Sequence, residues 1–148
     1  MAALLQSSGV HDWLTRYVEL ARAHGLTPVV TFHHFSSPRW LLAAGGWEDE
    51  RTPERFARFC EVAMNHLGDL IGVACTLNEP NLPYLLKVMG VTGEPPEARA
   101  NIPVWVGAAK ALGIEPAQVA PFQFNATESG YAIKLAAHRA ATAAIKAV

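Results

Sequence analysis

The chain has 148 residues, of which 51% are hydrophobic and 17% are charged, and its formal net charge is −1. This length and composition predict one globular domain with a single hydrophobic core. The balanced charge offers nothing that would attract nucleic acid or an anionic membrane, and no apolar run approaches the roughly 18 residues of a membrane span, so neither partner is expected.

The chain begins with a predicted helix, a strand and a loop. Apolar side chains recur at three- and four-residue spacing over residues 11–24, and Gly25 then predicts the end of a helix. Residues 29–35 are β-branched and aromatic, and Ser36-Ser37-Pro38 follows, which predicts a strand with a loop at its carboxyl end. Residues 38–52 are expected to form a loop that contains two tryptophans.

Two histidines and two tryptophans stand out in this first unit. His33 and His34 are adjacent, so they should point to opposite faces of the strand and cannot both bind one metal ion in regular geometry. This argues against a zinc site, and no other metal and no cofactor is expected. Trp40 and Trp47 could form an aromatic platform for sugar rings, but core filling under the loop is the favoured interpretation.

A second helix and a second strand follow. Thr52-Pro53-Glu54 is a typical helix start, with a capping residue, a proline in the first position and an acid in the first turn. Gly68 predicts the end of this helix. The apolar run that starts at Leu70 indicates a buried parallel strand, and it ends in Thr76-Leu-Asn-Glu-Pro80.

Beyond Asn81 the pattern weakens. Pro and Gly residues break up the sequence to about residue 100, a short amphipathic segment covers residues 104–112, and an Ala-rich helix is predicted from about Glu128 to the end. Only two convincing strands are found, and a two-stranded parallel sheet is not an independent domain. The chain is therefore expected to be part of something larger. Cys60 and Cys75 lie in apolar segments and are expected to be buried free thiols.

Asn78 and Glu79 are the strongest candidates for chemistry. They stand at the carboxyl end of a predicted parallel strand, where α/β barrels hold their active sites. A carboxyl group in a partly apolar surround can donate or accept a proton, and the neighbouring amide can fix a hydroxyl-bearing ligand. The alternative is a surface loop Glu beside an Asn that forms a turn before Pro80.

Four motifs together resemble glycoside hydrolase family 1, the β-glucosidase family. They are Thr31-Phe-His-His-Phe35, Pro38-Arg-Trp-Leu41, Gly45-Gly-Trp47 and Thr76-Leu-Asn-Glu-Pro80, and the resemblance is strong over residues 11–82. It implies an α/β fold, namely part of a (β/α)₈ TIM barrel from about its second to its fourth helix. Residues 1–148 would form this partial barrel domain, with a variable loop region at about residues 83–127.

The resemblance also implies roles for single residues. Glu79 would be the general acid/base of a retaining β-glycosidase, and Asn78 would hydrogen-bond the 2-hydroxyl of the sugar. His34 matches a histidine that contacts the glycone, and Phe35 stands where the family usually has Trp. His33 occupies a position to which no function is carried over. The expected substrate is a β-linked sugar.

The second catalytic carboxylate is missing from this sequence. The family's nucleophilic glutamate lies in a T-E-N-G motif, which the chain does not contain, so the chain alone is expected to be inactive. It is interpreted as a fragment of a β-glycosidase. The alternative is a non-catalytic sugar-binding module or a partial barrel that self-associates through its open sheet edges. Because residues 1–5 do not resemble a secretory signal, a cytoplasmic location is expected.

Overall fold

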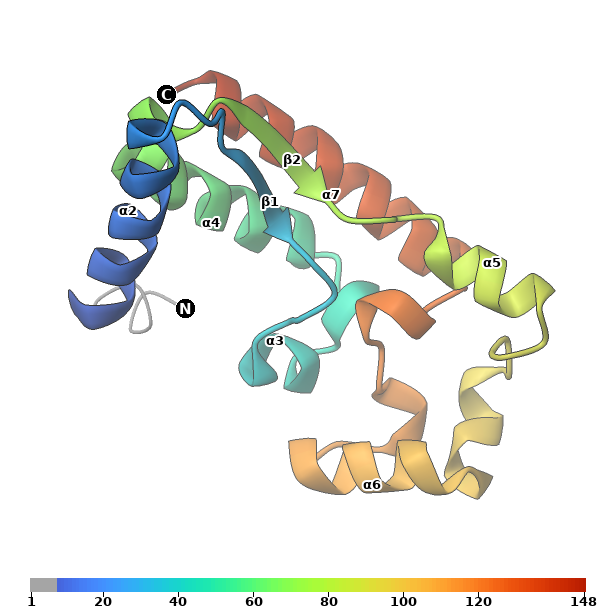
Figure 1. Ribbon diagram of the computed structural model, residues 1–148. Coiled ribbons are helices and arrows are strands. Elements are labelled where there is room, and N and C mark those ends of the chain that lie inside the picture. Colours follow the sequence, from blue (N-terminus) through green and yellow to red (C-terminus); the bar gives the residue numbers. More distant parts are fainter. Residues whose placement is uncertain (1–7) are drawn as a thin grey trace.

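The computed structural model describes residues 8–148, and the side chains from residue 13 onward (Figure 1). Residues 1–7, where the sequence predicts no secretory signal, lie outside the described residues. In chain order the elements are α2 (Ser8–Ala23), β1 (Val29–His33), α3 (Arg39–Ala43), η1 (Gly46–Glu48), α4 (Thr52–Leu67), η2 (Gly68–Leu70), β2 (Val73–Leu77), α5 (Leu82–Val88), η3 (Pro96–Asn101), α6 (Pro103–Leu112), η4 (Pro116–Gln118), η5 (Phe122–Phe124) and α7 (Glu128–Lys146), where η marks a 3₁₀ helix.

The two strands form one parallel sheet. Val29 pairs with Val73 and His33 pairs with Leu77, so β1 and β2 run in register and end at the same edge. The prediction of consecutive parallel βα units is confirmed for this part of the chain. Figure 1 shows α4 and α7 side by side behind the strands, as expected for a parallel sheet whose strands are joined by helices.

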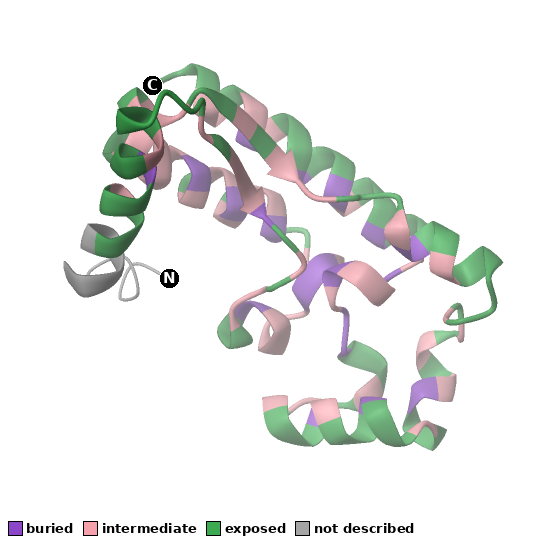
Figure 2. Cartoon of the chain, in the orientation of Figure 1, coloured by how far each residue is buried: buried purple, intermediate pink, exposed green. Residues whose placement is uncertain are grey.

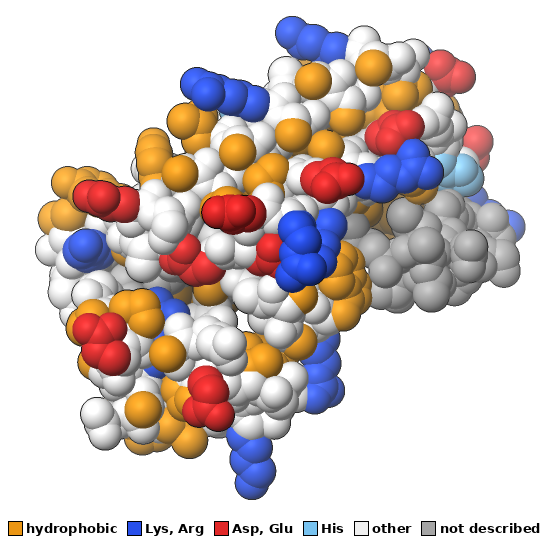
Figure 3. All heavy atoms as spheres, turned by 180° about the vertical axis from the view of Figure 1, so that it is seen from behind, with side chains coloured by type: hydrophobic (Ala, Val, Ile, Leu, Met, Phe, Trp, Pro, Cys, Tyr) orange, Lys and Arg blue, Asp and Glu red, His pale blue; other side chains and the backbone are white. Residues whose placement is uncertain are grey.

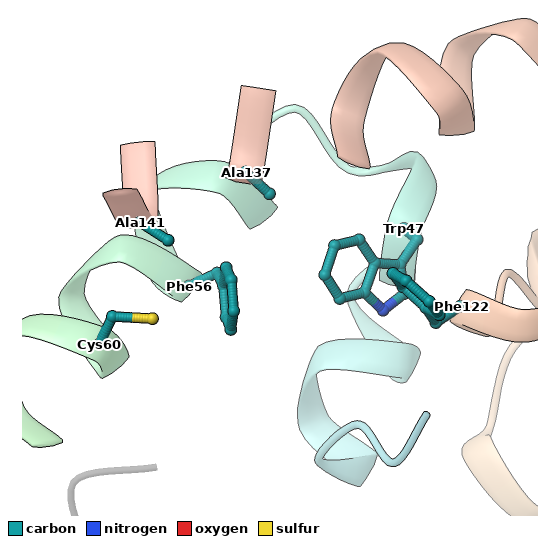
Figure 4. Close-up of a cluster of buried hydrophobic side chains, with 6 residues drawn as sticks. All are labelled: Trp47, Phe56, Cys60, Phe122, Ala137 and Ala141. Atoms are coloured by element: carbon teal, nitrogen blue, oxygen red, sulfur yellow. The ribbon is translucent and has the colours of Figure 1, made fainter. Parts of the chain in front are cut away.

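The main core lies between α4, α7 and the loop after β1. It contains the packed rings of Trp47, Phe56 and Phe122. Figure 4 shows that α7 contributes Ala137 and Ala141, which face Phe56 and Cys60 of α4. Small residues on α7 allow the two helices to approach closely. Burial raises the pKa of the Cys60 thiol to about 12, so this cysteine is an inert core residue, as the sequence predicts.

The Gly45-Gly-Trp47 motif has a direct steric reason. Gly46 has φ +58°, and a Cβ atom there would lie 2.4 Å from the Ala120 carbonyl oxygen. That same carbonyl accepts a hydrogen bond from the Trp47 amide at 3.0 Å. Only glycine therefore allows η1 to approach residue 120 closely enough to bury Trp47 completely. The favoured interpretation of Trp47 as core filling is confirmed.

Three expectations about the second unit need correction. Thr52 is the first residue of α4 rather than its cap, and its hydroxyl donates to the Gly46 carbonyl at 2.6 Å. The second strand begins at Val73, because residues 68–70 continue from α4 as a 3₁₀ turn. The strand is also not buried: Val73 and Cys75 are exposed (Figure 2), since β2 pairs only with β1 among the described residues.

Residues 82–127 are more ordered than the sequence suggests. Helix α5 forms despite Pro83, because a proline in the first turn of a helix gives up no intrahelical hydrogen bond. Helix α6 matches the predicted amphipathic segment and ends at Gly113, which has φ +73°. A second hydrophobic cluster centres on Trp105, Ala109 and Val119.

The surface carries no concentrated charge on the face seen in Figure 3, where acidic and basic side chains are interspersed among apolar ones. Within the described residues, no helix is both long enough and apolar enough to cross a bilayer.

Candidate functional site at the carboxyl edge of the sheet

The two strands bring the predicted site residues to one edge. His33 pairs with Leu77, and the Asn78 amide then donates a hydrogen bond to the His33 carbonyl at 2.9 Å. His34 and Asn78 directly follow the two strands, so the pairing of the strand ends brings both residues to the same edge of the sheet. All four predicted site residues, namely His34, Phe35, Asn78 and Glu79, lie at this carboxyl edge.

The backbone turns sharply at both strand ends. Phe35 has φ +64° and Glu79 has φ +43°, and they are the two non-glycine residues with positive φ in the described part of the chain. Such a conformation costs roughly 1–3 kcal/mol and persists only where the surroundings enforce it. Both residues are among the predicted site residues, and each lies just beyond the end of one strand.

The side chains at this edge are accessible. His34 and Glu79 are exposed, while Phe35 and Asn78 are half-buried. The ring of Phe35 contacts His34 edge-on, with centroids 5.0 Å apart, and also packs near Phe122. The described residues do not provide the partly apolar surround expected for Glu79, because its side chain is exposed and β2 pairs with no strand other than β1 among these residues.

His33 has the opposite environment to His34. It is 6% exposed, and its ring centroid lies 4.6 Å from that of Phe122 and 4.8 Å from that of Trp47. Desolvation, with the nearby His34 as a second cause, lowers the pKa of His33 to about 4, so the ring is neutral at physiological pH. The two histidines thus face different surroundings, as strand alternation predicts.

Ser37 holds this arrangement together and was missed by the sequence analysis. Its hydroxyl accepts a hydrogen bond from Trp47 Nε1 at 3.0 Å and shares a second hydrogen bond with His33 Nε2 at 3.1 Å. It thereby ties the loop after β1 to the core directly behind the turn at Phe35. The sequence carries no signal for this role beyond the position of Ser37 in the loop between His33 and Trp47.

Trp40 is neither a buried core residue nor a free platform. Its side chain is 40% exposed, and the Arg55 guanidinium lies 5.7 Å from its ring centroid. Arg55 also pairs with Asp49 at 2.8 Å. The hydrogen bonds and charge of Arg51, with Arg55 adding to them, lower the pKa of Asp49 to about 2. The loop of residues 38–52 is therefore fixed by charged contacts as well as by Trp47.

A buried polar network joins the loop to α7. Asn125 donates through Nδ2 to the Trp47 backbone carbonyl at 3.2 Å, and the backbone carbonyl of Asn125 accepts a hydrogen bond from Lys134 Nζ at 2.6 Å. Desolvation lowers the pKa of Lys134 to about 8. Thr127 caps α7 by accepting from the Gly130 amide at 3.0 Å, and its hydroxyl donates to Glu48. None of these positions is marked by sequence spacing.

The geometry defines a parallel α/β protein whose polar side chains gather at the carboxyl edge, as in barrel enzymes. No cluster of three or more metal-ligating residues occurs within the described residues. Comparison with protein families matches residues 3–131 to glycosyl hydrolase family 1. The chain therefore belongs to this family, and the match extends well beyond the strong resemblance over residues 11–82.

Individual glycosidases match about half of this chain in sequence. Lactase/phlorizin hydrolase of Rattus norvegicus is 38% identical over 69 residues, which is 47% of this chain and 4% of that protein. Beta-glucosidase A of Acetivibrio thermocellus is 33% identical over 75 residues, or 51% of this chain and 17% of that protein.

Solved structures match nearly the whole chain. Beta-glycosidase BGL167 is 63% identical with a TM-score of 0.92, and beta-glucosidase 1317 is 36% identical with a TM-score of 0.80. Each match covers 95% of this chain and 34% of the other, so the chain spans about a third of the length of these two structures.

Proposed function

We propose that this chain contributes the acid/base half of the active site of a retaining β-glycosidase built on a (β/α)₈ barrel. Glu79 protonates the leaving glycosidic oxygen and then, as a carboxylate, activates the water that releases the sugar. The substrate is a β-linked sugar of the β-glucoside type. Family membership supports the reaction class, and the edge geometry supports the choice of residues.

The observation that carries the proposal is the hydrogen bond from the Asn78 amide to the His33 carbonyl at 2.9 Å. It joins the ends of two neighbouring strands, so a carboxylate, an amide and an imidazole line the same edge. A bound sugar ring needs such convergent groups, because its hydroxyls must be fixed before the anomeric carbon can be aligned for reaction.

Each neighbour of Glu79 has a separate role in this proposal. Asn78 hydrogen-bonds the 2-hydroxyl of the sugar, where contacts that strengthen in the transition state are worth most. His34, which is exposed beside it, binds further glycone hydroxyls. Phe35 packs edge-on against His34 and provides an apolar surface for the sugar ring.

Catalysis by retention requires a second carboxylate about 5 Å from the first, which attacks the anomeric carbon. The sequence has no T-E-N-G motif to supply it. We therefore expect the isolated chain to release no product above background, even though it contains Glu79.

The test is a chimera in which this chain replaces the matched third of beta-glycosidase BGL167, with which it is 63% identical. The chimera should hydrolyse an alkyl β-glucoside, whose leaving alcohol has a high pKa, and for this substrate Glu79→Gln should lower kcat/KM by about 10²–10⁴-fold, the usual contribution of a general acid/base. The loss should be smaller in the glycosylation step for a substrate whose leaving group has a low pKa, because such a group needs no protonation.

Glu97→Gln is the matched control, because Glu97 is also an exposed glutamate but lies in η3, away from the sheet edge. It should leave kcat/KM unchanged. If the Glu79 variant of a folded, active chimera kept full activity on substrates with poor leaving groups, Glu79 would not be the acid/base.

A further inference from the structure

A small cavity lies beside the loop that follows β1. It has a volume of about 150 Å³ and is lined by residues of β1, of the loop after β1 and of α4, and we call it the His33 cavity. Dry cavities of about this size with apolar walls can hold a benzene ring. Half of the lining is aromatic, contributed by Phe32, Trp40, Trp47, Phe56 and Phe59. The His33 cavity therefore has the size and the walls to hold one aromatic ring.

The His33 cavity is separate from the edge that carries the proposed catalytic group. Of the two adjacent histidines, only His33 lines it, together with Phe56 and Phe59 of α4. His34 and Glu79 are exposed and do not belong to its lining. A molecule in the cavity would thus lie against α4 and leave both of these side chains accessible.

His33 offers a polar atom that has no partner among the described residues. Its Nδ1 is buried without a hydrogen bond, whereas its Nε2 is bonded to Ser37 Oγ at 3.1 Å. Ser37 Oγ also accepts from Trp47 Nε1 at 3.0 Å, because an indole N–H can only donate. The hydroxyl proton of Ser37 then goes to His33 Nε2, and this network assigns the proton of the neutral imidazole to Nδ1. A ligand atom that accepts from Nδ1 would relieve the desolvation cost of this donor.

Arg55 brings a positive charge to the same cavity. Its Nη1 pairs with Asp49 at 2.8 Å, which uses one of the five N–H donors of the guanidinium. Asp49 also pairs with Arg51 at 2.9 Å, so two guanidinium groups share one carboxylate and one positive charge is in excess. A carboxylate is the anion that best matches the planar donor fork of an arginine.

We propose that the His33 cavity is a second small-molecule site, which binds a monocyclic aromatic carboxylate of the benzoate class. The ring of the ligand packs among the aromatic walls, one carboxylate oxygen accepts from His33 Nδ1, and the carboxylate pairs with the Arg55 guanidinium. A carboxylate without a ring, or a ring without a charge, would make only part of these contacts. The inference does not depend on the catalytic role of Glu79.

Titration of the full chain with sodium benzoate tests the proposal. The indole N–H signals in ¹H–¹⁵N NMR spectra report the place of binding, because Trp40 and Trp47 line the cavity whereas Trp105 lies in the second hydrophobic cluster. Benzoate should shift the signals of Trp40 and Trp47 in a saturable manner, with a Kd on the order of 1 mM. The signal of Trp105 should stay in place. Acetate and benzyl alcohol should each bind at least tenfold more weakly than benzoate.

A matched pair of arginine variants tests the charge. Arg55→Gln should weaken benzoate binding by about tenfold or more. Arg51→Gln removes the other partner of Asp49 but lies outside the cavity, so it should change the Kd by less than about twofold. His33→Phe keeps an aromatic ring and removes the Nδ1 donor, and it should also weaken binding by about tenfold. Circular dichroism of each variant checks that the fold is retained.

Three results would overturn the proposal. The first is equal weakening by Arg51→Gln and Arg55→Gln, since benzoate would then respond only to net charge. The second is a shift at Trp105 as large as those at Trp40 and Trp47, which would indicate unspecific binding to apolar surface. The third is the absence of a saturable shift up to about 20 mM benzoate in the unsubstituted chain, a result that does not depend on how any variant folds.

Discussion

His33 and His34 occupy adjacent positions and do different work. The buried ring of His33 anchors the loop after β1 through Ser37, and the exposed ring of His34 is available to a ligand. Phe35, which has a positive φ, lies between His33 and Ser37 and packs against the main core. These contacts offset the free-energy cost of its strained backbone conformation. His33 must be neutral in this arrangement, because burying a charged imidazolium ring would cost free energy.

Stability should therefore fall in mild acid. The pKa of His33 is about 4 in the folded chain and about 6.5 in the unfolded chain, so the unfolded state binds more protons between these pH values. The His33 contribution is complete above pH 6.5 and is lost as pH falls toward 4, by about 3 kcal/mol in all. Urea unfolding across this range measures it. Asp49, whose pKa is about 2, affects stability only at lower pH.

The substitution His33→Phe should remove about one proton from this pH dependence while keeping an aromatic ring in the core. His24→Gln is the control, since His24 is exposed on the surface at the end of α2. It should leave the slope between pH 4 and 6.5 unchanged. A slope that persists in the Phe variant would assign the titration to another group.

At the level of elements, α7 is held in place at its first turn. Thr127 caps the helix, Glu48 accepts from the hydroxyls of Thr127 and Ser129, and Asn125 connects the same turn to the Trp47 carbonyl. Residues about 80 positions apart in the sequence are thus joined where the loop of the first unit meets the helix of the second. The absence of a side chain at Gly130 makes this possible.

Replacing Gly130 with Ala should destabilise the chain by about 1–3 kcal/mol, because the new Cβ would lie 2.0 Å from Asn125 Nδ2 and force that amide away from its partners. Gly107→Ala in α6 is the matched change, since no atom lies within 4 Å of its Cβ position. It should stabilise by about 0.5–1 kcal/mol through helix propensity. Thermal and urea unfolding compare the two, and equal effects would contradict the steric explanation.

These contacts show what the sequence could and could not reveal. Helical spacing of apolar residues located α4, and runs of β-branched, aromatic or apolar residues located both strands, while the motifs located Asn78 and Glu79. Asn125 and Ser37 act through partners that only the fold brings close, so no local pattern marks them. Cys75 was misjudged because an apolar strand predicts burial only when neighbouring strands are present.

At the scale of the whole molecule, the side chains described from residue 13 onward form two hydrophobic cores. The first lies under the sheet and contains Trp47 and Phe122. The second lies within residues 94–124 and surrounds Trp105, whose indole donates to Glu94 Oε1 at 2.5 Å and whose ring lies 5.6 Å from the Arg99 guanidinium. Figure 1 shows α6 at a distance from the strands. The second core therefore stabilises the segment that connects β2 to α7, and not the sheet itself.

Trp105→Ala should consequently unfold one part of the molecule more readily than the other. Truncating a buried aromatic side chain costs about 3–5 kcal/mol, and we expect this cost to fall on the second core, within residues 94–124. Native-state hydrogen exchange should show faster exchange of the α6 amides, with the amides of α4 and α7 unchanged. Tyr84→Ala, at an exposed aromatic residue of α5, should change neither group. If α4 and α7 lost protection together with α6, the two cores would form one cooperative unit, and the stability of the sheet would depend on the segment that connects β2 to α7.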